Sequence, residues 1–137
     1  VSADNARFAT PGVNIGLFCS TPMVALTRAV APKHAMELLL LGDLISADRA
    51  AQMGLVNWVV AVDELDEYVA TVAGKIASKS RKTLSIGKQA FYKQSEQTLA
   101  EAYSSCARVM THNMLTDDAQ EGIDAFITKR KPNWSHR

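Results

Sequence analysis

The stretch that decides the fold is residues 8–31, FATPGVNIGLFCSTPMVALTRAVA. It begins with a short extended run, passes through Pro11-Gly12 and a loop of small residues, and enters an apolar helix after Thr21-Pro22. Proline suits the first position of a helix, where no amide hydrogen is needed, and the preceding threonine can cap it. A strand, a loop of small residues and a helix entrance together bring backbone close to a ligand. The sequence therefore predicts that this loop lines a binding site.

The residues that follow predict two short helices and a strand. Pro32 and Gly42 are the start and stop signals of one helix, because proline suits a first turn and glycine a C-terminal cap. Ser46 is a favourable N-cap for a second helix, which Gly54 ends. Residues 55–60, LVNWVV, form a β-branched and aromatic run of strand length. A strand pair is not a stable sheet by itself, so this part of the chain needs a sheet that it does not contain.

The rest of the chain predicts four consecutive helices. Apolar residues recur at helical spacing through residues 62–76, which predicts the first helix. The basic residues 79–82, KSRK, end it, and a second helix follows. Thr98 and Glu101 have the spacing of a capping box at the start of the third helix. The fourth helix begins near Thr116 and is predicted to continue to the basic residues before Pro132, because acids at its start and bases at its end match the helix dipole.

The composition is that of an ordinary soluble protein of one-domain size: 137 residues, 47% apolar and 21% charged. The net charge of +1 gives no basic field, so no nucleic-acid partner is expected. No apolar run approaches the roughly 18 residues of a spanning helix, so no membrane partner is expected. The cysteines and histidines lack metal-ligand spacing, and we expect no metal and no separate cofactor. The start at Val1 indicates a beginning within a longer sequence.

Four segments carry patterns that occur together, in this order and at these distances, in one protein family. The most specific is residues 42–56, GDLISADRAAQMGLV, which joins a helix to the last strand of that family's core. Residues 121–132, EGIDAFITKRKP, match its terminal helix. Residues 6–8 ahead of Pro11 match its strand before the active-site loop, and residues 26–30 match the helix after it. The chain therefore resembles the crotonase family, the enoyl-CoA hydratase/isomerase superfamily.

The resemblance implies an α/β fold: a crotonase-like ββα spiral, of which only the last part is present, followed by a helical trimerisation region. Residues 1–60 would be the C-terminal part of the spiral core, and residues 61–137 the helical trimerisation domain. The earlier spiral turns, about half of a family subunit, are absent from this sequence. We therefore expect a homotrimer or a dimer of trimers, with Trp134 in the tail docking on a neighbouring subunit.

The resemblance also implies that acyl-CoA or enoyl-CoA is the ligand, with coenzyme A as part of the substrate. Family members stabilise an enolate oxygen with two backbone N–H groups, which here lie in the absent half, as does one of the two hydratase glutamates. Gly12 occupies the position of the second glutamate, so no catalytic residue is identifiable. Some family members carry an acid further along this loop, near Ser20, but a serine hydroxyl is a poor substitute for it. Alternatively, Gly12 only supplies a tight turn after Pro11.

Other residues are candidates for ligand contacts. Asn14 and Cys19, with Ser20, are acyl-pocket candidates, although Asn14 could instead satisfy nearby backbone and Cys19 could be a small buried residue. Phe126 and Lys129 are three residues apart and are predicted to share a face of the last helix. In the family these positions meet the adenine and phosphate of CoA. The alternative is a core phenylalanine and a lysine that matches the helix dipole.

We expect an enoyl-CoA hydratase-like lyase or isomerase of fatty-acid and lipid metabolism. It would be active only when this chain is joined to the N-terminal half of the subunit. One alternative is a non-catalytic CoA-binding or regulatory family member, since Gly12 withholds the acid that hydration requires. A second alternative is an assembly module whose helices trimerise without the spiral core. The resemblance implies a cytoplasmic location in a bacterium and a mitochondrial one in a eukaryote.

Overall fold

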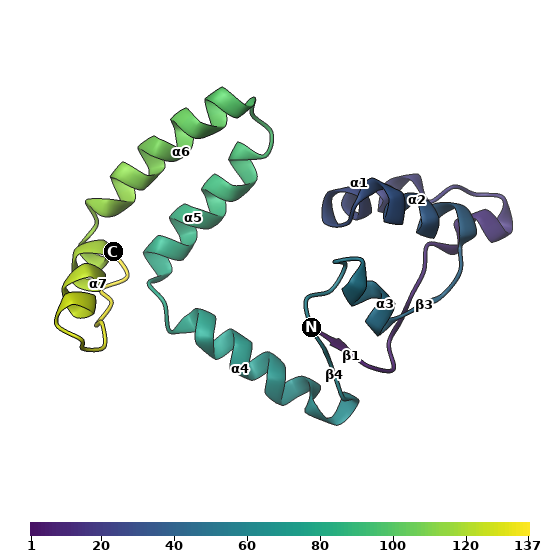
Figure 1. Ribbon diagram of the computed structural model, residues 1–137, viewed down its shortest axis with the longest axis horizontal. Helices are drawn as coiled ribbons and strands as arrows, with labels where there is room; N and C mark the ends of the chain where they lie inside the picture. Colours follow the sequence, from purple (N-terminus) through teal and green to yellow (C-terminus); the bar gives the residue numbers. More distant parts are fainter. The chain divides into compact units, whose positions relative to one another are not determined.

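In the computed structural model, which describes residues 1–137, three short helices carry the core of the first of two compact units, residues 1–72 (Figure 1). They are α1 (Ser20–Ala29), α2 (Pro32–Leu41) and α3 (Ala47–Gln52). Their buried apolar side chains meet in one cluster, around which Cys19, Met23, Ile45 and Leu55 pack. The members of the cluster are Leu26, Val30, Ala35, Leu38, Leu39 and Met53.

The first unit also contains two pairs of very short strands. β1 (Ser2–Ala3) runs parallel to β4 (Val59–Val60), and β2 (Arg7–Phe8) runs antiparallel to β3 (Ile45–Ser46). The strand predicted over residues 55–60 is therefore wrong for its first four residues. Its first two backbone N–H groups, those of Leu55 and Val56, both donate to the carbonyl of Ala50 and fold the chain back on α3 instead of extending it.

Most ends of these helices are set by capping residues that lie close by in the sequence. Gly42 adopts a left-handed conformation with φ +65° and ends α2, and the Ser46 hydroxyl accepts the backbone N–H of Arg49 at the start of α3, as the sequence predicts. The cap predicted at Thr21 is wrong. α1 begins at Ser20, two residues earlier than predicted, because the backbone N–H of Ser20 donates to the carbonyl of Phe18 at 2.7 Å and turns the chain there.

The predicted helices after residue 61 are all present. A 3₁₀ turn, η2 (Val62–Glu64), leads into α4 (Leu65–Ala77), and the second compact unit, residues 73–137, contains α5 (Arg81–Gln94), α6 (Leu99–Met114) and α7 (Asp117–Ile127). Within this unit α5 and α6 lie side by side and α7 follows them (Figure 1). The capping box between Thr98 and Glu101 is confirmed. The last helix is shorter than predicted: it ends at Ile127 and does not include the basic residues before Pro132.

Both units expose large apolar side chains. In the first unit Ile15 is 77% exposed and Leu44 is 72% exposed, and in the second Leu99 and Leu115 are exposed to a similar degree. Where such side chains gather into a patch, they are typical of surfaces that pack against other protein segments. None of the helices combines the length and the apolar character that crossing a membrane requires.

Candidate functional site

The predicted binding loop closes on itself in the first unit. It begins with a 3₁₀ helix, η1 (Pro11–Ile15), which places Gly12 opposite the end of the loop. The backbone N–H of Leu17 donates to the carbonyl of Gly12 at 2.9 Å, and the N–H of Gly12 donates to the sulfur of Cys19 at 3.3 Å. Cys19 is half-buried against the core cluster, so its thiol forms part of the loop's own packing.

This closure leaves no room for a side chain at position 12. A Cβ atom on Gly12 would lie 2.7 Å from the Cys19 sulfur and 2.7 Å from the carbonyl oxygen of Leu17. Both separations are shorter than carbon-to-heavy-atom contacts in packed proteins, which are near 3.5–4.0 Å. Gly12 is therefore required by the shape of the loop, and a carboxylate at this position does not fit the observed conformation.

The loop is fastened to the C-terminal end of α2. The hydroxyl of Thr10 donates to the carbonyl of Leu38 at 2.8 Å, and the amide nitrogen of Asn14 lies 3.4 Å from the carbonyl of Gly42. The Leu38 carbonyl also accepts the backbone N–H of Gly42 at 3.1 Å, so Thr10 is its second donor, whereas Asn14 approaches the carbonyl of the cap residue itself. Asn14 is exposed and contacts backbone, which matches the alternative interpretation of this residue. Ser20 is also exposed, and its hydroxyl lies 3.3 Å from the carbonyl of Phe18.

Phe126 and Lys129 lie in the second unit and do not share a helix face. α7 ends at Ile127, and Lys129 follows the cap residue with φ +53°. The backbone N–H of Lys129 donates to the carbonyl of Phe126, and the next N–H, of Arg130, donates to that of Ala125 at 3.0 Å. This is the hydrogen-bond pattern of a Schellman motif, which ends the helix. The prediction of one continuous helix through Lys129 is thus wrong.

Phe126 is not a core residue, because 84% of its surface is exposed. Its ring borders a hollow of about 500 Å³ between α5, α6 and α7, which Ile123 and Trp134 also line. Asn113 also lines this hollow, and its side-chain oxygen is buried without a hydrogen-bond partner. The hollow thus offers aromatic surface, which suits a planar ligand.

A tail follows Lys129 and returns along α7. Glu121 on α7 accepts both terminal nitrogens of the Arg130 guanidinium, at 2.6 and 2.8 Å, and also the backbone N–H of Asn133 at 2.7 Å. The Arg130 hydrogen bonds are the main reason that the pKa of Glu121 is lowered from its ordinary 4.5 to about 2. Arg130 is therefore occupied within the chain, whereas Lys129 takes part in no ion pair.

Asp118, one turn before Glu121, holds the end of the same tail. Its carboxylate accepts the hydroxyl of Ser80, the backbone N–H and hydroxyl of Ser135 at 2.6 and 2.8 Å, and the backbone N–H of His136. Asp118 is 1% exposed, and these donors, Ser80 first among them, lower the pKa of its carboxyl. The sequence pattern had indicated only a match to the helix dipole, because the partners of Asp118 are distant in sequence.

The tail tryptophan also belongs to this arrangement. The indole nitrogen of Trp134 donates to the carbonyl of Ser78 at 2.8 Å. Its ring lies so close to Gly122 that a Cβ atom there would be 3.2 Å from the ring edge. The tryptophan was predicted to dock on a neighbouring subunit. Within the chain its ring packs beside Gly122 of α7, and docking on a neighbouring subunit stays a prediction.

The Glu121 carboxylate should give the protein a defined acid sensitivity. A carboxyl whose pKa is lower in the folded state stabilises that state fully above its ordinary pKa of 4.5 and loses this contribution as the pH falls to about 2. We expect urea unfolding to show Glu121→Gln as less stable than the native protein at neutral pH, with the two curves converging across this window. An offset that persists unchanged at the acid end would contradict the ion-pair explanation.

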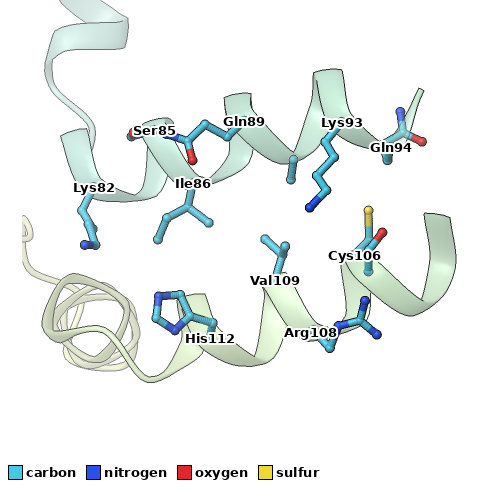
Figure 2. A pocket seen from close by; sticks show the side chains of 12 residues that line it. Lys82, Ser85, Ile86, Gln89, Lys93, Gln94, Cys106, Arg108, Val109 and His112 are labelled. Atoms are coloured by element: carbon cyan, nitrogen blue, oxygen red, sulfur yellow. The ribbon is translucent and has the colours of Figure 1, made fainter. Parts of the chain in front are cut away.

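A groove of about 550 Å³ between α5 and α6 was not anticipated from the sequence. Ile86 and Val109 point toward one another across its middle (Figure 2). Lys82 and His112 lie at one end of the groove, and Lys93 and Arg108 lie toward the other. No acidic side chain lines it, so the groove is apolar in the middle and cationic at its ends. Its residues come from two helices, and only the pairing of the helices brings them together. No group of three or more His, Cys, Asp or Glu side chains is placed to hold a metal ion.

Comparison with known proteins identifies the chain's family. The family model described as enoyl-CoA hydratase/isomerase matches residues 1–137. The mitochondrial enoyl-CoA hydratase domain-containing protein 3 of Rattus norvegicus is 52% identical over 136 residues, which are 99% of this chain and 45% of that protein. The human protein of the same name is 53% identical, again over 99% of this chain and 45% of the relative. A probable enoyl-CoA hydratase of Mycobacterium leprae is 37% identical over the whole chain and 54% of its own length.

Solved structures agree with the sequence matches. The crystal structure of an enoyl-CoA hydratase from Mycobacterium smegmatis superposes with a TM-score of 0.93 at 45% identity, covering 96% of this chain and 51% of that one. The human enoyl coenzyme A hydratase domain-containing protein 3 superposes with a TM-score of 0.91 at 52% identity, covering 96% and 52%. The chain spans about half the length of the relatives that it matches. It has the fold of the C-terminal half of a crotonase subunit and belongs to the enoyl-CoA hydratase/isomerase family.

Proposed function

We propose that this chain forms one wall of an acyl-CoA or enoyl-CoA site in a family member that does not carry out two-glutamate hydration. The observation that carries the proposal is the loop closed over Gly12, where a Cβ atom would lie 2.7 Å from Cys19 and from Leu17. Hydration of an enoyl thioester requires one group to deprotonate water and another to protonate the α-carbon. The loop supplies neither at this position, and Ser20 is an exposed hydroxyl with no base beside it in the loop.

Chemistry that depends on a stabilised thioester enolate remains compatible with this loop. Backbone N–H groups aimed at a developing oxyanion supply much of the rate enhancement in such sites, and they require no side-chain acid. In the proposed function these groups come from the half of the protein outside this chain, and the product is that of an isomerase or lyase of fatty-acid metabolism. The relatives' names support a mitochondrial location, and the exposed apolar faces of the helices support a trimer.

A non-catalytic CoA-binding or regulatory protein is the second candidate, and the same loop favours it. The two candidates differ in turnover and not in binding. The test uses the complete protein, meaning this chain preceded by an N-terminal half, either its native one or that of the human relative that is 53% identical. Acyl-CoA binding is measured by titration calorimetry, and turnover is measured on a panel of enoyl-CoA and acyl-CoA thioesters. Turnover of any member supports the enzyme, and binding without turnover supports the regulatory protein.

Hydration of crotonyl-CoA is the decisive assay within that panel. We expect a rate at least about a hundredfold below that of a two-glutamate family member, because one acid–base group typically contributes that factor or more. A comparable hydration rate would show that another residue replaces the missing carboxylate, and it would contradict our interpretation of Gly12. The control is a relative with both glutamates, assayed under the same conditions.

The proposed CoA contacts give a separate prediction. We expect Phe126→Ala and Lys129→Ala in the complete protein each to weaken CoA binding by about tenfold, because base stacking and a phosphate charge pair each contribute on the order of 1–2 kcal/mol. Titration calorimetry with CoA measures the effect. Ile127→Ala and Lys131→Ala are the controls, since Ile127 is an exposed apolar neighbour without an aromatic ring and Lys131 is an exposed lysine. Unchanged affinity in both test variants would refute the assignment of these positions.

A further inference from the structure

The groove between α5 and α6 has the size and lining of a small-molecule site. Its volume is about 550 Å³, and Ile86 and Val109 face each other across its middle (Figure 2). Ligand pockets in proteins typically enclose roughly 300–1,000 Å³ and combine an apolar lining with a few polar groups that orient the ligand. All residues that line the α5–α6 groove belong to the second compact unit, so its shape depends on one helix pair.

The ionisable groups at the two ends of this groove are basic. Lys82 lies at one end with His112, and Lys93 lies toward the other end with Arg108. No carboxylate lines the groove. The ion pairs of the chain are all formed by other residues, so none of these four side chains has an anionic partner within it. The ends of the groove therefore offer positive charge that the chain itself does not neutralise.

The distance between the two ends sets the length of a ligand that reaches both. Lys82 and Lys93 lie on the same helix, and their separation in sequence corresponds to about 16 Å along its axis. An extended carbon chain advances by about 1.25 Å per bond, so a chain of about 14 carbon atoms spans this distance. Arg108 uses one of its donors on the hydroxyl of Ser104, at 2.8 Å, and its other donors are available to such a ligand.

We propose that the α5–α6 groove binds a linear long-chain dicarboxylate, whose methylene chain lies between Ile86 and Val109 and whose carboxylates lie at the two ends. Burial of the methylene chain favours binding, and the two charge pairs select the length and the second acidic group. A fatty acid with one carboxylate has the same apolar chain but satisfies only one end. The proposal does not depend on acyl-CoA binding, because none of the residues proposed to contact acyl-CoA lines this groove.

The test compares three ligands by titration calorimetry with the complete protein: tetradecanedioate, tetradecanoate and octanedioate. We expect tetradecanedioate to bind at least about fivefold more tightly than either of the others, because tetradecanoate lacks one charge pair and octanedioate cannot reach both ends. Lys82→Gln and Lys93→Gln should each weaken tetradecanedioate binding by about fivefold. Lys88→Gln is the matched control, since this exposed lysine lies on the same helix and does not line the groove.

The thiol of Cys106 reports where the ligand binds. Cys106 lines the groove and is half-buried, whereas the other free cysteine, Cys19, lies in the first unit. At ten times the dissociation constant of tetradecanedioate about a tenth of the protein is free, so alkylation of Cys106 by iodoacetamide should slow by about tenfold. Peptide mass spectrometry measures both thiols, and the alkylation rate of Cys19 should not change.

Three results would overturn the proposal. A Cys106 thiol that reacts in denaturant but not in the native, ligand-free protein would show that the groove is covered. Equal affinities for tetradecanedioate and tetradecanoate, or equal effects of Lys93→Gln and Lys88→Gln, would show that the ends of the groove bind no carboxylate. Displacement of tetradecanedioate by CoA, without protection of Cys106, would show that the dicarboxylate occupies the proposed acyl-CoA site instead.

Discussion

Replacing Gly12 with glutamate is expected to destabilise the first unit and to leave the protein without hydratase activity. A Cβ atom at this position would lie 2.7 Å from the Leu17 carbonyl oxygen and from the Cys19 sulfur, so the loop has to open before any longer side chain is accommodated. Overpacking of this kind typically costs about 1–3 kcal/mol, and here one of the two obstacles is backbone, which relaxes poorly. The carboxylate would then be carried on a loop of altered shape.

Urea unfolding and crotonyl-CoA hydration of the complete protein check both parts of this prediction. Gly12→Ala isolates the Cβ clash from the carboxylate, and adding Cys19→Gly should recover only part of the loss, because the Leu17 carbonyl remains. Gly74→Ala is the matched control: a Cβ atom there meets nothing within 4 Å, and the residue lies inside α4. That change is expected to be neutral or to stabilise by up to about 1 kcal/mol. A stable Gly12→Glu variant that hydrates crotonyl-CoA would refute the steric argument.

Leu39→Ala is expected to give the largest loss among single core substitutions. Leu39 is 1% exposed and belongs to the cluster formed by the first three helices. Truncating a fully buried leucine removes its transfer free energy and leaves a cavity, which together cost about 2–5 kcal/mol. With only six members, the cluster has few neighbours that could move to fill that cavity.

Leu40→Ala provides the comparison for this prediction. Leu40 is the next residue of α2 and is 58% exposed, so the same change of residue type tests exposure at equal helix propensity. We expect it to cost less than about 1 kcal/mol in urea unfolding of the chain. Equal losses at the two positions would mean that the exposed face of α2 is packed against something in solution, and the core assignment would have to be revised.

The fold could be predicted where its determinants are local. Gly42 ends α2 because only a left-handed residue fits there, and Ser46 and Thr98 cap their helices through contacts within three residues. The strand over residues 55–60 could not be bounded in this way. β-branched residues indicate extended structure, but hydrogen bonds to the Ala50 carbonyl decide where the extension begins, and these depend on the position of α3.

The site shows the same division between local and distant contacts. Gly12 was recognised as the informative residue, yet the reason for it is its contact with Cys19, which no spacing rule indicates. The sequence places Lys129 on a helix because basic residues suit a helix end, whereas the backbone N–H groups of Lys129 and Arg130 close a Schellman motif that ends α7 at Ile127. Asp118 was the residue whose role was missed, since its Ser80 and Ser135 partners become neighbours only after folding.

The parallel pairing of β1 with β4 has a consequence for the order in which the chain folds. Ser2 is the register partner of Val59, so β1 cannot form this pair until nearly the whole first unit has been synthesised. Until then the edge of β1 that pairs with β4 lacks this partner, and closing the long loop between the two strands has an entropic cost. The α5–α6 pair, joined by a short connection, needs no such wait. During translation the β1–β4 pair of the first unit is therefore completed only when the chain has reached the strand that leads into α4.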